Sequence, residues 1–492
     1  VAQDPRQHES LWKGESTPRW RFGAWAMAGA AAVLVVWLGG PGEPAYRAYL
    51  REQNAPATWE DLRTYYEVIP QEKNVAVDYI TSSGGSRQDV LGMLADKLKE
   101  ANPGLNWHEV RTRARESLDD YLYIVGNRRI EPGEPLDETA WALTETYWEN
   151  TTSPLAEELK RIAEDGRRPA RYFMLYFRPE HVEVISAIYT SELTSLRDKG
   201  QELHLDALYW SKKGEPARAV EACLAILPLA ESLAEEPILS AQLTRFAILG
   251  RAVATLETVL DRASLTEADL RRLQDGFAEI EAPYQQDWMM RHGLMGERVL
   301  ALEGHYLWDE PNDENVSALV DLREIVEKLV MPPVNERMVV LHFYSKVLDD
   351  AAEGLPRDGR ELRELQESFQ GMPLAMGGLA NVHVDTTVRT FDSEWRARIR
   401  LRLAQTAAAV ERFRLEHDRW PEDLSELVPE YLDEVPRDLF CLDDEPLRYV
   451  VRPDGSRRIY SVGRNHRDDG GLTHRLDEQG ADIVFVLGAG PR

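Results

Sequence analysis

The chain contains very little cysteine, since Cys223 and Cys441 are the only two in its 492 residues. Two cysteines cannot form a disulfide framework, and their spacing does not fit a zinc site. Cys223 lies on an apolar helical face, where a free buried thiol is the usual arrangement. The sequence leaves open whether Cys223 and Cys441 pair with each other.

Positive charge is also scarce, because 58 lysines and arginines face 85 aspartates and glutamates, for a net charge of −27. A surface of this sign repels the phosphates of nucleic acid and the headgroups of anionic lipid. Nucleic acid is therefore not expected as a partner. The excess of acidic side chains is typical of a soluble, well-solvated surface.

Motifs that carry a known chemistry are absent as well. The sequence has no glycine-rich phosphate loop, no Gly-x-Ser-x-Gly and no His-Glu-x-x-His. Four possible metal ligands fall on one helical stretch, but their offsets do not place them on one face; they are His292, Glu297, Glu303 and His305. We therefore predict no catalytic residues and no certain cofactor.

One long uncharged run, Phe22–Gly40, is the sharpest physical signal in the chain. As a helix it would span about 28 Å, which matches the hydrocarbon core of a bilayer. Arg19 and Arg21 precede it, so the positive-inside tendency puts residues 1–21 in the cytoplasm. A cleaved signal peptide or a buried soluble helix are the alternatives. We expect a single-pass protein of a bacterial inner membrane with its bulk in the periplasm.

Residues 41–390 are predicted to form a mainly α-helical domain outside the cytoplasm. Apolar side chains recur at three- and four-residue spacing in several runs, among them His181–Lys199, Leu203–Lys212, Ala217–Ala234 and Ile238–Leu260.

Two local signals mark helix starts in this domain. Thr58 is the expected N-cap of a helix over Trp59–Tyr66, and Ser264 with Glu267 has the pattern of a capping box. The segment Leu205–Ala219 resembles one tetratricopeptide helix–turn–helix unit. Because no second copy follows at the expected period, the prediction is an irregular, solenoid-like helical array.

Residues 391–492 are predicted to form a small α+β module. A looser linker over Gly371–Val384 precedes a long helix, roughly Phe391–His417. Three strand-like runs follow, separated by turn residues, and predict a small antiparallel meander. The runs are Leu447–Arg452, Arg457–Val462 and Ala481–Leu487.

Within this module, Phe413–Pro421, Tyr460–Gly463 and Ala481–Ile483 follow one another in a familiar order. In this order they resemble the globular domain of the type II secretion major pseudopilins, over roughly residues 396–487. The chain lacks the prepilin-peptidase site and the Phe-start helix with which that family begins. Because these features are missing, we expect that the module does not polymerise as a pilin does. The resemblance then implies that it serves recognition or capping.

The same resemblance implies a calcium site, because the family binds calcium in the loop that precedes the Ala-Asp-Ile segment. The matching oxygen donors are Asn465, Asp468, Asp469 and Asp482. Calcium takes six or more oxygen ligands. A cluster of carboxylates without a cation would need arginines instead, and Arg464 and Arg467 are the nearest in sequence.

From these observations, three functions remain. The first is a non-enzymatic, membrane-anchored extracytoplasmic scaffold that holds protein partners in a membrane or envelope complex. The second is an extracytoplasmic hydrolase that acts on envelope polymers. The third is an accessory component of a type II secretion or pilus-like machine. A concave groove with clustered carboxylates would favour the enzyme, and a large exposed apolar patch would favour the scaffold.

Overall fold

The computed structural model describes residues 43–52, 55–66, 69–83, 92, 95–96, 99–100, 102–114, 141, 145–165, 170–172, 182–284, 288–303, 378–472 and 482–488. The expected cytoplasmic tail, residues 1–21, and the expected membrane span, Phe22–Gly40, lie outside these residues. Within them, no helix is both long enough and apolar enough to cross a membrane.

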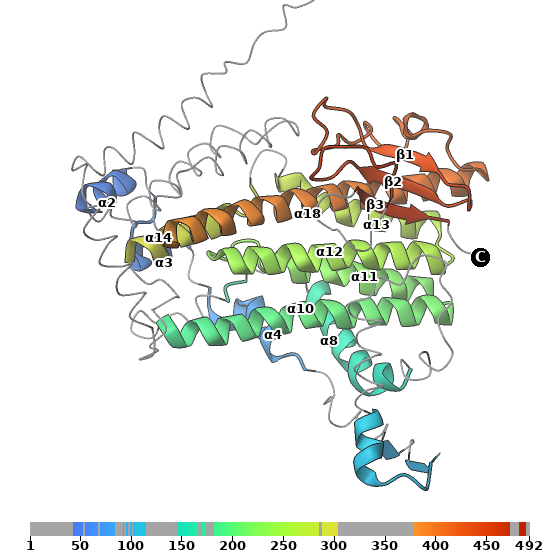
Figure 1. Ribbon diagram of the computed structural model, residues 1–492, viewed down its shortest axis with the longest axis horizontal. Helices are drawn as coiled ribbons and strands as arrows, with labels where there is room; N and C mark the ends of the chain where they lie inside the picture. The colour runs from blue at the N-terminus through green and yellow to red at the C-terminus, as the bar shows by residue number, and fades with distance from the viewer. Residues whose placement is uncertain are drawn as a thin grey trace, which may run out of the picture.

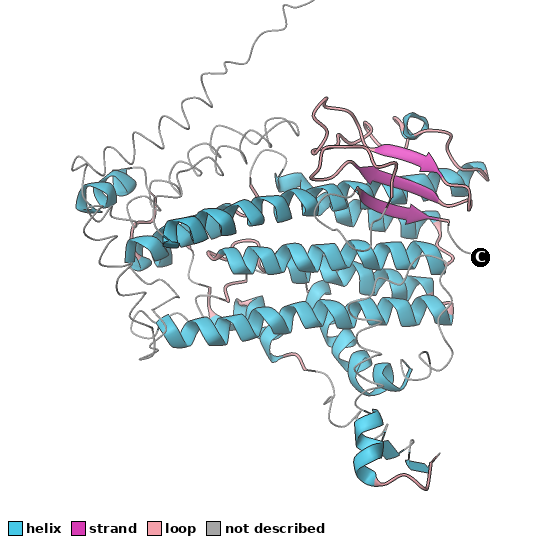
Figure 2. Cartoon of the chain, in the orientation of Figure 1, coloured by secondary structure: helices cyan, strands magenta, loops and turns pink. Residues whose placement is uncertain are grey.

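The described part of the chain is mainly α-helical, as predicted (Figure 2). Its first elements are α2 (Glu43–Glu52), α3 (Trp59–Tyr65), the 3₁₀ turn η1 (Gln71–Lys73), α4 (Val75–Thr81), the π-helical turn η2 (Trp148–Thr152) and α8 (Ser153–Glu164). Thr58 is the N-cap of α3, as expected, since its Oγ1 accepts the Asp61 N–H at 3.0 Å.

The longer elements follow. They are α10 (Val182–Lys213), α11 (Pro216–Glu231), α12 (Leu239–Arg262), α13 (Glu267–Glu281), the 3₁₀ turn η4 (Ala282–Tyr284), α14 (Arg291–Glu303), α18 (Gly378–His417) and the 3₁₀ turn η6 (Leu424–Leu427). The sheet consists of β1 (Arg448–Val451), β2 (Arg457–Ser461) and β3 (Ile483–Leu487).

Three helix boundaries differ from the predicted ones. Helix α10 is continuous where two helices were expected, because Leu196 and Leu203, on either side of Gly200, are both buried in one core. Helix α18 begins at Gly378, inside the expected linker, since extending a formed helix costs less than nucleating one.

The third difference is the cap of α13. The capping box is formed by Thr266 and Asp269, not by Ser264 and Glu267. Both pairs have the same spacing, so the sequence does not distinguish them. Glu267 instead pairs with Arg412 of α18 at 2.8 Å, which is a tertiary contact.

The helices are stacked side by side. Helices α10, α11 and α12 pack against one another, and α12 and α13 pack against α18. Figure 1 shows α10, α12 and α18 running alongside one another, with the sheet over the C-terminal half of α18. The short turn at Gly214, which has a φ of 75°, joins α10 to α11 as a helical hairpin.

The sheet is an antiparallel meander of order β1-β2-β3, as predicted. Tyr449 is opposite Ile459, and Ile459 is opposite Phe485. Ile459 and Phe485 are buried and belong to the same apolar cluster as residues of α10, α11, α12 and α18. The boundary expected at residue 390 falls within α18, and one core lies on both sides of it.

Candidate functional site

The four residues predicted to bind calcium lie together in the loop between β2 and β3. The Asn465 amide donates to Asp469 Oδ2 at 2.8 Å. The two carboxylate oxygens of Asp482 accept the N–H groups of Asp469, at 3.3 Å, and Gly471, at 2.7 Å. The structure therefore brings Asn465, Asp469 and Asp482 into one hydrogen-bonded turn.

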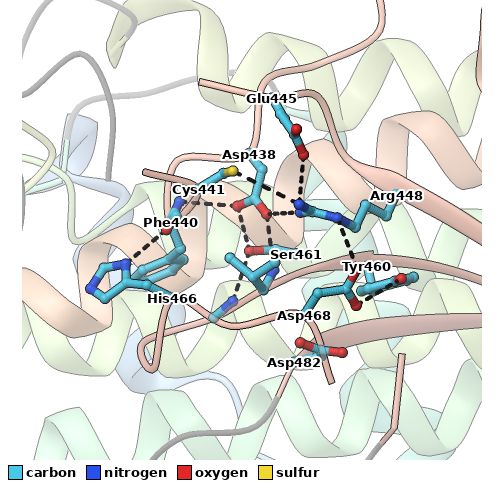
Figure 3. A network of polar contacts seen from close by, with 12 residues as sticks. Asp438, Phe440, Cys441, Glu445, Arg448, Tyr460, Ser461, His466, Asp468 and Asp482 are labelled. Carbon is cyan, nitrogen blue, oxygen red and sulfur yellow. Dashed lines mark hydrogen bonds and ion pairs between the residues drawn. The ribbon is translucent and has the colours of Figure 1, made fainter. Parts of the chain in front are cut away.

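Asp468 contacts both this turn and the strands (Figure 3), and its Oδ1 accepts the Gly470 N–H at 2.8 Å. Its Oδ1 accepts the Tyr460 hydroxyl at 3.0 Å, and its Oδ2 lies 3.2 Å from Arg448 Nε. Among the described residues, no three His, Cys, Asp or Glu side chains converge as the ligands of a metal ion would. Calcium binding by this loop stays a prediction.

Arginines do reach the loop, but from the strands. Arg448 pairs with Asp468, and Arg452 and Arg458 donate to the carbonyls of Gly470 and Gly471 at 3.3 and 2.6 Å. Arg464, one of the two arginines expected here, lies 3.8 Å from Asp392 of α18 instead. The sequence could not reveal this, because the contacts depend on how β1 and β2 lie beside the loop.

One carboxyl of the loop, that of Asp482, has a raised pKa because it is buried. Removal from water, together with the nearby charges of Asp469 and Asp468, raises the pKa of Asp482 to about 6. The two accepted N–H groups act in the opposite direction, since they favour the ionised form. Asp482 thus has two backbone donors within the described part of the loop.

Next to the loop lies a polar network centred on Asp438, which is 1% exposed. Asp438 accepts the Phe440 N–H at 3.0 Å, the Val462 N–H at 2.9 Å and the Ser461 hydroxyl at 2.6 Å (Figure 3). Arg448 Nη1 lies 3.6 Å from its Oδ2. Burial raises the pKa of this carboxyl, and the accepted hydrogen bonds partly offset that effect.

The Asp438 network holds two segments of the C-terminal module together. It ties the segment that contains Pro436 and Pro446 to the end of β2. The nearest histidine, His466, has its Nδ1 2.7 Å from the carbonyl of Phe440. Ser461 donates its hydroxyl proton to Asp438 at 2.6 Å.

Both cysteines are free and buried, so they do not form a bridge. Cys441 lies beside the Asp438 network, with its Sγ 3.9 Å from Arg448 Nη2. Cys223 is packed inside α11, and burial raises the pKa of its thiol.

In the described part of the stretch that carries His292 and Glu297, both side chains have protein partners. His292 Nδ1 lies 2.8 Å from the Tyr66 hydroxyl, and burial lowers the pKa of His292 to about 4. Glu297 accepts the Leu239 N–H at 3.2 Å, and burial raises its pKa to about 7. The side chains of Glu303 and His305 lie outside what the structure describes.

A groove of about 810 Å³ lies among α4, α8, α11 and α13, and no pattern in the sequence predicted it. Its lining includes apolar side chains of α8 and α11, polar groups such as Tyr79 and Tyr284, and carboxylates from α11 and α13. A volume of this size is typical of sites that hold a ligand or a short peptide.

Two carboxylates on the α11 side of the groove are already neutralised. Glu231 pairs with Arg245 at 2.7 Å, and Arg245 is completely buried behind it. Glu235 pairs with Arg171, whose guanidinium also lies over the Tyr66 ring, 5.1 Å from its centre. These carboxylates are therefore poorly suited to act as a general acid and base.

Comparison with known proteins gives no further identification. No protein-family model matches the chain, no curated protein matches it, and no solved structure matches its fold.

Proposed function

We propose that this protein is a non-enzymatic scaffold that is anchored in a bacterial inner membrane and holds a protein partner outside the cytoplasm. Phe22–Gly40 would be the anchor, and residues 41–492 would lie in the periplasm. The helical hairpin of α10 and α11 would belong to an irregular, tetratricopeptide-like array. The pseudopilin-like module, residues 391–492, would serve recognition within a membrane or envelope complex.

The groove among α4, α8, α11 and α13 is the observation that carries this proposal. A groove with clustered carboxylates was expected of an enzyme, but here Glu231 and Glu235 are paired with arginines. We therefore interpret the groove as a surface for a partner. Stacked helical hairpins commonly bind partner segments on such concave surfaces. The groove offers an apolar base with polar and charged walls, which is the usual composition of a recognition site.

The alternative, a hydrolase acting on envelope polymers, has less support. It needs two carboxyl groups with different acidities, of which one donates a proton and the other attacks or activates water. Glu231 and Glu235 are held by arginines, and the buried Asp438 is held by two backbone N–H groups as well as by Ser461. An accessory role in a type II secretion or pilus-like machine remains compatible with the scaffold, because both require a partner.

Site-specific photo-crosslinking in intact cells tests the scaffold. A photoreactive amino acid at Arg272, which is exposed in the groove, should give a discrete adduct with one partner protein. The same amino acid at Asp433, which is exposed outside the groove, is the control and should give none. Equal labelling at both positions, or no adduct at Arg272, would refute the proposal.

The membrane part has its own test. Protease added to intact spheroplasts should digest residues 41–492 and spare the anchor. Complete protection of residues 41–492 would show that the topology is the opposite of the proposed one, and the periplasmic location would then be wrong.

A further inference from the structure

The two edges of the sheet have different surroundings. β3 forms one edge and packs against α12 and α18. β1 forms the other edge, and Figure 1 shows it on the side of the sheet away from α12. The outer edge of β1 is therefore the place where a further strand would pair with this sheet.

The register of the sheet fixes which backbone groups of β1 point to this edge. The Arg452 N–H donates to the Ser456 carbonyl at 2.8 Å, and hydrogen-bonded pairs alternate with non-bonded pairs along an antiparallel ladder. Val450 therefore bonds to β2, whereas Tyr449 and Val451 direct their N–H and C=O groups away from β2. The outer edge of β1 thus presents the backbone of two residues.

These outward groups have no strand beside them. At the start of β1, the Leu447 N–H donates to the Pro436 carbonyl at 2.9 Å, so an extended segment covers that position. Beyond it, no described residue forms a backbone hydrogen bond with Tyr449 or Val451 on this edge. The side chain of Val451 is 54% exposed. An added strand would therefore find both backbone partners and an apolar side chain here.

The start of β1 is rich in negative charge. Arg448, its first residue, lies near three carboxylates, those of Asp438, Glu445 and Asp468. One guanidinium thus serves three acidic side chains at this end of the strand, so this end does not favour a further carboxylate.

The other end of β1 is rich in positive charge. Arg452, Arg457 and Arg458 are half-buried, and none of them pairs with a carboxylate of the described residues. Each donates instead to a glycine carbonyl. Hydrogen bonds from Ser456, and then the charges of Arg458 and Arg452, lower the pKa of Asp454. Three guanidiniums thus share one nearby carboxylate, which favours an acidic group of a partner at this end.

We propose that the outer edge of β1 binds an extended segment of a partner protein, which adds to the sheet as a fourth strand and carries an aspartate or glutamate beside Arg452. Its backbone would pair with Tyr449 and Val451, and an apolar side chain would lie on Val451. In recognition of this kind, main-chain hydrogen bonds supply affinity and side chains supply specificity. None of these residues lines the groove, so this surface goes beyond the proposed function.

A second copy of the chain fits this edge less well. In the antiparallel register that pairs Tyr449 of one copy with Val451 of the other, Arg448 would lie opposite Arg452. Like charges directly opposite each other destabilise a strand pair. Charged side chains on an edge strand also serve in many proteins only to block pairing, and the experiment distinguishes this role from partner binding.

Fluorescence anisotropy with the purified full chain in mild detergent tests the proposal. The probe is a labelled ten-residue peptide that alternates valine with glutamate. A second peptide has the same side chains but a methyl group on every backbone nitrogen, so it cannot donate hydrogen bonds to the edge. Because the net charge of the chain is −27, non-specific attraction does not explain binding of an acidic peptide.

Two variants test the backbone and the charge of the edge separately. Val451→Pro removes an N–H that points away from β2, and we expect it to weaken binding about fivefold, which corresponds to one hydrogen bond. Arg452→Gln should weaken binding about threefold. The matched control is Arg111→Gln, which removes an exposed arginine from the helical segment 107–114, away from the sheet (Figure 1), and should have no effect.

The methylated peptide should not bind, and hydrogen exchange of the Tyr449 and Val451 amides should slow when the unmodified peptide binds. Equal binding of the two peptides would overturn the proposal, and this comparison does not depend on how well a variant folds. Absence of binding would show that the arginines only block the edge. A dimer of the chain that Val451→Pro dissociates would identify a second copy as the occupant and would also overturn the proposal.

Discussion

The buried carboxylate of Glu257, on α12, accepts the backbone N–H of Val486, on β3, at 2.7 Å. β3 is an edge strand, so this N–H has no partner on a neighbouring strand at that edge. A side chain of the helical body therefore completes the hydrogen bonding of the C-terminal sheet, and the two parts of the chain are held together at this point.

This contact predicts that removing the Glu257 carboxylate destabilises the protein. Glu257→Ala should lower the free energy of unfolding by about 1–3 kcal/mol, because the buried Val486 N–H loses its acceptor. Hydrogen exchange of the Val486 amide should become faster. Glu257→Gln keeps an acceptor oxygen and is the control. If the alanine and glutamine variants exchange at the same rate, the contact does not stabilise the sheet.

The Asp438 network predicts that two substitutions lower the free energy of unfolding by different amounts. Asp438→Ala should lower the free energy of unfolding by about 3 kcal/mol, since it leaves two backbone N–H groups without their acceptor and removes the ion pair with Arg448. Ser461→Ala removes one hydrogen bond to the same carboxylate and should cost about 1 kcal/mol. Urea unfolding followed by tryptophan fluorescence measures both values. Equal costs would mean that Asp438 does not organise the network.

The loop between β2 and β3 predicts an outcome for calcium. If Asn465, Asp468, Asp469 and Asp482 bind calcium, millimolar calcium should raise the melting temperature of the full chain, because the cation binds only the folded loop. Differential scanning fluorimetry measures this temperature. Asp469→Ala should abolish the rise, and an unchanged melting temperature would show that arginines such as Arg448 hold the loop without a metal.

Glu297 predicts a dependence of stability on pH. Its pKa rises from 4.5 in the unfolded chain to about 7 in the folded one, because burial disfavours the ionised form. Its stabilising contribution is therefore complete below pH 4.5 and is lost as the pH rises through 7.

Glu297→Gln keeps the acceptor for the Leu239 N–H and cannot ionise. It should stabilise the protein by about 1–3 kcal/mol at pH 8 and have little effect at pH 4.5. Thermal melts across this range measure the difference, with Glu221→Gln as the exposed control. A gain that is the same at both pH values would show that the buried charge is not its cause.

The sequence by itself determined the local elements of this protein. The mainly helical character, the N-cap at Thr58 and the antiparallel meander all follow from periodicity, capping residues and turn residues. These signals act between residues a few positions apart, so they can be read without knowing the path of the chain.

Only the tertiary structure decided which distant residues meet. It selected Thr266 rather than Ser264 as the cap of α13, and it brought Arg448 rather than Arg464 to Asp468. It also formed the groove, whose two walls come from α11 and α13. The physical reason is that a charge or a cap finds its partner through the packing of whole helices and strands, and the order of residues along the chain does not contain that packing.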